Sequence, residues 1–171
     1  MRKVLLVDDE KIERNGIRML LQRMPEEFEI REASNGVEAL RMLREETADM
    51  VLTDIKMPQM DGIELIEKIR EYGSQMPIAI FSGYGEFDYA QKAIRNGVSN
   101  YILKPVKPQE FEETIRKILR TIEQREQERE KQRESRQYLY RHYLKMYLET
   151  GKSTYAELLK SSPEKSDQFN R

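Results

Sequence analysis

One segment, residues 50–62 with the sequence MVLTDIKMPQMDG, constrains the fold of this chain more than any other. A short apolar run leads directly to Asp54, and Pro58 followed by Asp61 and Gly62 then turns the chain. An apolar run of this length is typical of a parallel strand that helices cover on both faces. Asp54 is therefore expected at the carboxyl edge of the sheet, where open α/β folds bind their ligands. Taken alone, this aspartate could be a metal ligand, a nucleophile or a helix cap.

The rest of the chain repeats the same alternation of strand and helix. Three further apolar runs predict strands, and residues 28–33 predict a weaker strand because Phe28 and Ile30 alternate with polar residues. Apolar residues recur at helical spacing after each of these segments. Five strands alternating with five helices predict an α/β fold with a doubly wound parallel sheet. The strands are expected at residues 3–7, 28–33, 50–54, 77–82 and 100–103.

The composition excludes several kinds of site. The chain has no cysteine, so disulfides and thiolate metal sites are excluded. Charged residues make up 36% of the chain but balance to a net charge of −1, so no overall field favours nucleic acid or an acidic membrane. No apolar run is long enough for a signal peptide or a bilayer span. We therefore expect a cytoplasmic protein without membrane contact.

Polar side chains stand at four of the five strand ends: Asp8 and Asp9, then Asp54, Ser82 and Lys104. These ends share one edge of a parallel sheet, so the side chains can converge. Three carboxylates repel one another, and a hard divalent cation such as Mg²⁺ relieves that repulsion. An ammonium and a hydroxyl nearby suit an incoming anion. The set predicts phosphoryl transfer onto Asp54, although each residue alone has an ordinary structural explanation.

The order of these motifs resembles the receiver domain of bacterial two-component response regulators. The matching segments are VDDE at 7–10, TDIKMPQMDG at 53–62, SG at 82–83 and YILKP at 101–105. The resemblance covers about residues 1–122 and implies a flavodoxin-like (βα)5 fold. It also implies that Asp54 accepts a phosphoryl group from a sensor histidine kinase. Mg²⁺ would be bound by Asp9, Asp54 and the backbone carbonyl of Lys56, and by Asp8 through a water.

The resemblance implies roles for further residues around the phosphoacceptor. Lys104 would pair with the phosphoryl group and Ser82 would donate a hydrogen bond to it. Tyr101 would be the switch aromatic whose rotamer follows Ser82, and the peptide bond before Pro105 would be cis.

Two positions concern the lifetime of the phosphorylated state. Lys56 and Tyr84 fall where the family varies and where the rate of dephosphorylation is set, so the lifetime stays open. Glu10 is expected to be an acidic neighbour of the site and not a metal ligand.

The composition changes at Glu123. Residues 123–137 contain no apolar residue, and no glycine or proline interrupts them, so the fifth helix is expected to continue. The predicted organisation is a receiver domain at 1–122, a charged helical linker at 123–150, and a short helix with a polar tail at 151–171. The last part would be the start of a truncated following region.

The long helix has two interpretations. One is a parallel coiled coil that joins two chains, with apolar ends and a polar middle on one heptad frame. The other is a solvated single helix steadied by ion pairs. The heptad frame consists of Ile115, Ile118, Ile122, Arg125, Arg129, Gln132, Arg136, Leu139, Tyr143 and Met146.

The output of the switch is expected to be transcription regulation. The segments at 82–94 and 143–151 are similar to those of response regulators with an AraC-type DNA-binding domain. The helix-turn-helix pair of such a domain is not found here, so DNA would be bound only through a domain absent from this chain. The other expected partners are a sensor histidine kinase and a second copy. The second copy would bind through the fourth helix, fifth strand and fifth helix, and through the helical extension.

Three alternatives remain. The chain could be a stand-alone receiver that acts by protein binding. It could be an aspartyl-phosphate phosphatase or phosphotransferase, but such an enzyme needs an acid two residues after Asp54, where Lys56 stands. A flavin carrier would need a phosphate-binding loop where Asp8, Asp9 and Glu10 stand. We therefore expect no enzyme activity beyond autophosphorylation and autodephosphorylation.

Overall fold

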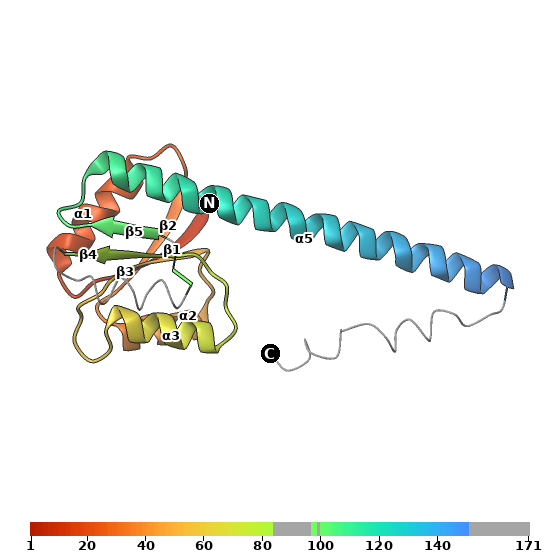
Figure 1. Ribbon diagram of the computed structural model, residues 1–171, viewed down its shortest axis with the longest axis horizontal. Coiled ribbons are helices and arrows are strands. Elements are labelled where there is room, and N and C mark those ends of the chain that lie inside the picture. The colour runs from red at the N-terminus through yellow and green to blue at the C-terminus, as the bar shows by residue number, and fades with distance from the viewer. Residues whose placement is uncertain (84–96, 99, 151–171) are drawn as a thin grey trace. The chain divides into compact units, whose positions relative to one another are not determined.

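The computed structural model of the protein describes residues 1–83, 97–98 and 100–150 (Figure 1). The chain forms two compact units, Met1–Glu123 and Gln124–Arg171. Among the described residues, no helix has both the length and the apolar character that crossing a membrane requires.

The first unit is built on a five-stranded parallel sheet. Its strands are β1 (Arg2–Val7), β2 (Phe28–Ala33), β3 (Met50–Asp54), β4 (Ile78–Ser82) and β5 (Asn100–Leu103), in the order β2-β1-β3-β4-β5. The chain moves outward from β1 to β2, then crosses back to β3 and continues in the other direction. The predicted doubly wound sheet is confirmed. The topological switch point lies between β1 and β3, where this kind of fold binds its ligands.

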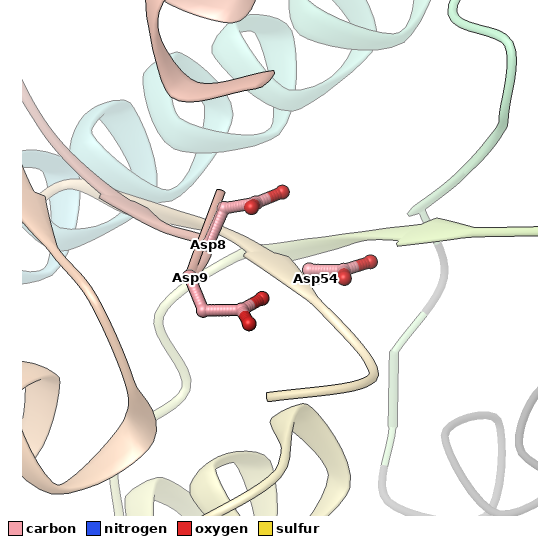
Figure 2. A group of neighbouring side chains, drawn as sticks. All are labelled: Asp8, Asp9 and Asp54. Carbon is pink, nitrogen blue, oxygen red and sulfur yellow. The ribbon is translucent and has the colours of Figure 1, made fainter. Parts of the chain in front are cut away.

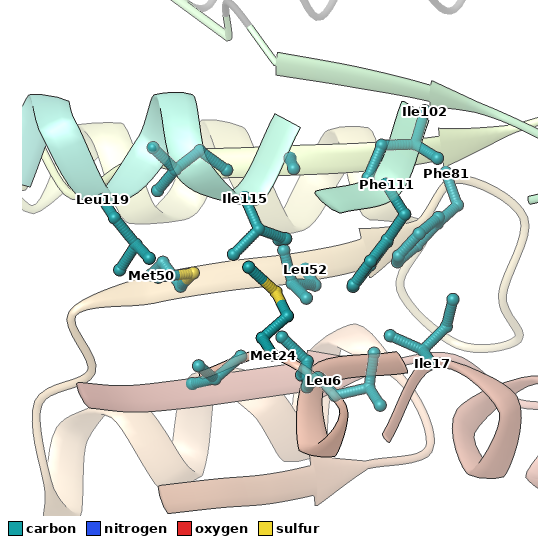
Figure 3. Packing of buried hydrophobic residues seen from close by; sticks show 14 of the residues in the cluster. Leu6, Ile17, Met24, Met50, Leu52, Phe81, Ile102, Phe111, Ile115 and Leu119 are labelled. Carbon is teal, nitrogen blue, oxygen red and sulfur yellow. The ribbon is translucent and has the colours of Figure 1, made fainter. Parts of the chain in front are cut away.

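Helices cover both faces of the sheet (Figure 1). One face carries α1 (Lys11–Gln22) and the first part of α5 (Pro108–Thr150), which pack with alternate strand residues such as Leu6 and Leu52 (Figure 3). The other face carries α2 (Gly36–Glu45) and α3 (Gly62–Glu71), packed with the intervening residues Val7 and Val51. Apolar residues on both faces explain why the inner strands β1, β3 and β4 read as nearly continuous apolar runs. The helix expected between the fourth and fifth strands lies outside the described residues, as does the short helix expected at 151–171.

The turn from β3 to α3 is fixed by Asp61 and Gly62. The Asp61 carboxylate accepts a hydrogen bond from the Glu64 amide at 2.8 Å, and the Glu64 carboxylate accepts one from the Asp61 amide at 3.2 Å. This reciprocal cap starts the helix. A Cβ at Gly62 would overlap the backbone carbonyl of Asp54. Only glycine lets the chain pass so close to the strand end.

The helix α5 continues for 43 residues, which confirms that it runs on through the charged segment. The coiled-coil interpretation placed the first three heptad positions in a contact between two chains, and for these positions it is wrong. Ile115, Ile118 and Ile122 are 0%, 0% and 7% exposed and pack in the core of the first unit. Helical spacing of three and four residues suits packing on a sheet as well as pairing with another helix, so the sequence could not separate the two.

Candidate functional site

Three aspartates meet at the switch point of the sheet (Figure 2). Asp54 is the last residue of β3, and Asp8 and Asp9 follow the end of β1, whose Val7 pairs with Thr53. One carboxylate oxygen from each lies within 4.8 Å of the other two. This set of oxygens suits a hard divalent cation.

Burial disfavours the charged form of the carboxylates in this cluster. Counted over the whole residue, Asp8 is 2% exposed and Asp54 is 9% exposed. Burial raises the pKa of Asp8 to about 6, although a hydrogen bond from the Glu10 amide and attraction to Lys104 oppose the rise. Burial also raises the pKa of Asp54, again against the attraction of Lys104. Both carboxylates are thus less stable in their charged form than free aspartate, and a cation would stabilise them.

The Lys104 ammonium lies among these carboxylates. Its Nζ is 3.1 Å from Asp54 Oδ1 and 3.5 Å from Asp8 Oδ2, and it also forms an ion pair with Glu13. Burial works to lower the pKa of Lys104, but the hydrogen bond to Glu13 and the attraction of Asp54 outweigh it, so the pKa is raised. The side chain stays protonated and offers three donors.

The turn after β5 places this lysine. The Lys104 amide donates to the Ser82 carbonyl at 2.8 Å, which ties the turn to the end of β4. The peptide bond between Lys104 and Pro105 is cis.

Ser82 and Tyr101 are in direct contact. Ser82 is the last residue of β4 and is fully buried. The Tyr101 hydroxyl donates to Ser82 Oγ at 2.6 Å, and the Ser82 hydroxyl donates to the Gly83 carbonyl at 3.2 Å. Tyr101 itself is 37% exposed. A change at Ser82 can therefore reach a side chain that is partly on the surface.

Lys56 shares an open pocket with Asp9, one of the three aspartates. This pocket is also lined by Met57, Pro58 and Asp61. The structure therefore brings together Asp8, Asp9, Asp54, Lys56 and Lys104, with Ser82 at the end of β4 and Tyr101 within β5. Tyr84, the other residue expected to affect dephosphorylation, lies outside the described residues.

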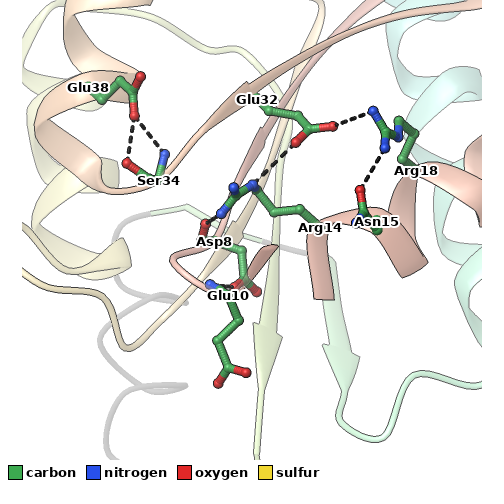
Figure 4. Close-up of polar contacts among 8 residues, drawn as sticks. All are labelled: Asp8, Glu10, Arg14, Asn15, Arg18, Glu32, Ser34 and Glu38. Carbon is green, nitrogen blue, oxygen red and sulfur yellow. Dashed lines mark hydrogen bonds and ion pairs between the residues drawn. The ribbon is translucent and has the colours of Figure 1, made fainter. Parts of the chain in front are cut away.

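Two residues of α1 outside the predicted motifs contribute to this site. Glu13 contacts Lys104, as noted above. Arg14 donates from Nη1 to the Asp8 carbonyl and from Nε to Glu32 Oε2 at 3.2 Å (Figure 4). One feature of the sequence could have indicated these two residues: both lie in the first turn of a helix that begins directly after the acidic run at 8–10.

The family described as "Response regulator receiver domain" matches residues 4–116. A Bacillus subtilis (strain 168) protein, "Uncharacterized transcriptional regulatory protein YesN", is 35% identical over 130 residues, which are 72% of this chain and 34% of that protein. "Transcriptional regulatory protein SrrA" of Staphylococcus aureus (strain NCTC 8325 / PS 47) is 38% identical over 127 residues, which are 71% of this chain and 52% of that protein. The chain therefore spans between a third and about half of the length of these relatives.

Solved structures of the same architecture are also similar. The REC domain of AraT, a response regulator from Geobacillus stearothermophilus, is 38% identical with a TM-score of 0.66, covering 73% of this chain and 98% of that chain. A two component transcriptional regulator AraC from Clostridium phytofermentans ISDg is 29% identical with a TM-score of 0.65, covering 72% of this chain and 97% of that chain.

Proposed function

The chain belongs to the response regulator receiver domain family, and from this premise we propose that it is a switch controlled by phosphorylation of Asp54. One observation carries the proposal: the Asp54 carboxylate lies 3.1 Å from the Lys104 ammonium and within reach of two further aspartates. A carboxylate so placed can attack phosphorus while the surrounding charges stabilise the transferred group.

The three aspartates fit Mg²⁺. Asp9 and Asp54 would bind it directly with the Lys56 carbonyl, and Asp8 would act through a water. The fit is supported by the 4.8 Å grouping of the oxygens and by the raised pKa of the two buried carboxylates. When bound, the ion would neutralise these carboxylates and the charge of the incoming phosphoryl group.

The chemical step uses residues of this chain around a phosphohistidine of a sensor kinase. An Asp54 oxygen forms the new bond to phosphorus as the bond between phosphorus and the imidazole nitrogen breaks, and the imidazole then takes up a proton. Lys104 pairs with the phosphoryl oxygens, and the Ser82 hydroxyl turns to donate to them. The transferred group thus draws the ends of β4 and β5 toward Asp54.

Tyr101 would transmit the change at Asp54 and Ser82 to the surface of the receiver. Its hydroxyl contacts Ser82 Oγ in the present structure, so movement of Ser82 changes the position of the ring on the surface that includes β5 and α5. We propose that this surface and the C-terminal half of α5 pair two copies. The domain layout proposed is a receiver at 1–122, a helical linker at 123–150 and a following region from 151.

The output would be transcription regulation through a DNA-binding domain that is not in this chain. The named relatives are described as transcriptional regulators, and they are two to three times as long as the part that matches. Lys56, two residues after Asp54, cannot act as the acid that an aspartyl-phosphate phosphatase needs. The regulator is therefore preferred over that enzyme.

The test is labelling by a small phosphodonor, acetyl phosphate, with Mg²⁺. One phosphoryl group should be added, as read from the intact mass, and Asp54→Ala should abolish the addition. Asp49→Asn, which changes an aspartate before the other end of β3 and keeps an oxygen that can accept from the Lys3 amide, should label like the unsubstituted protein. Labelling of Asp54→Ala at the normal rate would show that the phosphoacceptor is another residue.

A further inference from the structure

Within the described residues, the Lys104 ammonium has three carboxylate partners from three different elements. Asp8 and Asp54 come from the ends of β1 and β3, and Glu13 comes from the first turn of α1. The exposed fractions of the three side chains differ: 3% for Asp8, 13% for Asp54 and 37% for Glu13. Glu13 therefore holds the lysine from the solvent side, while the two aspartates hold it from the interior.

The three partners match the donor capacity of the lysine. An ammonium has three N–H donors, one for each of the three carboxylates. A phosphoryl group on Asp54 needs at least one donor, so one present partner has to give way. Release of Glu13 costs least, because its exposed carboxylate regains water and because ion pairs of exposed groups contribute little free energy. Release of buried Asp8 would cost more, because its carboxylate would lose the ammonium that faces it without regaining water.

We propose that Glu13 is a positioning residue that holds Lys104 in the unphosphorylated state and competes with the phosphoryl group for it. This inference rests on the proposed phosphorylation of Asp54 and adds a residue to that site. Glu13 would bias the switch toward the unphosphorylated state, by an amount that another side chain at this position would change. Among the described contacts, Glu13 pairs with Lys104 and not with Asp9 or Lys56, and, beyond the effect of burial, its charge also works to raise the pKa of Asp54. We assign its role to the direct pair with Lys104.

The expected effect of Glu13→Gln is a gain, which a merely structural role would not produce. With Mg²⁺, the affinity for beryllofluoride, a phosphoryl mimic, should rise about threefold, within the range expected for loss of one exposed ion pair. The rate of labelling by acetyl phosphate should rise in the same proportion. Thermal unfolding of the variant should stay close to that of the unsubstituted protein, since a fold defect would lower the affinity.

Glu10→Gln is the matched control. Glu10 also lies at the start of α1 and carries the same charge, but it is not among the carboxylates that contact Lys104. Its substitution should leave both measurements unchanged. An unchanged or weaker affinity in Glu13→Gln, or an equal gain in Glu10→Gln, would overturn the role of Glu13 while phosphorylation of Asp54 stands. If acetyl phosphate did not label the unsubstituted protein, that result would instead contradict the proposed function.

Discussion

Arg14 supports the site although it takes no part in the proposed phosphoryl transfer. Its guanidinium joins α1 to the carbonyl of Asp8 and to Glu32 on β2 (Figure 4). It thereby supplies a donor to the backbone at the point where β1 ends and the acidic turn begins. Hydrogen bonds of a charged group to a buried backbone acceptor are worth about 1.5–3 kcal/mol.

We therefore expect Arg14→Gln to lower the free energy of unfolding by about 2 kcal/mol in urea denaturation. It should also weaken Mg²⁺ binding, because the turn that carries Asp8 and Asp9 loses its support. Arg18→Gln is the control: Arg18 pairs with Glu32 and Asn15 but does not contact Asp8. Its cost should stay within about 0.5 kcal/mol. Equal losses from both substitutions would show that the contact with Asp8 is not what matters.

The buried Asp8 carboxylate makes the stability of the folded protein depend on pH. Its pKa is about 6 in the folded protein and 3.8 when unperturbed, so the folded state binds the proton more tightly than the unfolded state. The stability that this proton contributes is fully present below pH 3.8 and is lost as the pH rises through about 6.

Asp8→Asn should accordingly stabilise the metal-free protein at pH 7.5, by on the order of 2 kcal/mol, and the difference should vanish near pH 4. The measurement is urea denaturation in a chelator at several pH values. Adding Mg²⁺ should narrow the gap, because the ion stabilises only the charged form. A gap that does not vary with pH would contradict the assignment of the raised pKa to Asp8.

The residues of the site could be predicted to the extent that they stand at strand ends. Asp8, Asp54, Ser82 and Lys104 were found because parallel strands present their carboxyl ends at one edge. Glu13 could not be found in this way, since its contact depends on how α1 packs on the sheet. The same limit applies to the hydrogen bonds of Arg14.

At the level of elements, α5 combines two surfaces in one helix. Its first part packs on the sheet through Phe111, whose ring stacks on Phe81 at a centroid distance of 6.5 Å, and through three buried isoleucines. Its later part exposes apolar side chains, among them Leu139 at 48%. The sequence predicted the continuity of the helix, because no glycine or proline interrupts it. Which apolar residues serve the core could not be predicted, because the spacing is the same in both parts.

These two surfaces should respond differently to truncation of a side chain. Ile118→Ala removes buried volume from the core and should lower the free energy of unfolding of the first unit by about 2–5 kcal/mol. Leu139→Ala should leave that transition unchanged, as followed by chemical denaturation. A large loss from Leu139→Ala would mean that Leu139 contributes to the core of the first unit.

At the level of the whole molecule, the proposed pairing of two copies can be tested directly. Beryllofluoride with Mg²⁺ should shift the chain toward dimer in sedimentation. Met146→Glu, which places a charge in the exposed apolar part of α5, should weaken the dimer without affecting labelling of Asp54. Glu130→Gln, in the charged middle of the helix, is the control and should change neither property. A chain that stays monomeric in both states at high concentration would favour the solvated single helix.

The alignment of the strands has a consequence for how variants of this protein lose activity. Asp8, Asp54, Ser82 and Lys104 each stand at the end of a strand or one residue past it. The position of each such side chain is therefore set by the pairing of its strand with the neighbouring strand, as in Val7 with Thr53 and Ile80 with Tyr101. A slip of one residue in any strand would move that side chain by about 3.3 Å and turn it to the opposite face. Inactivating substitutions should therefore arise in the interior of the sheet as well as among polar residues. The apolar residues of the strands are therefore as necessary for the chemistry as the polar residues that carry it out.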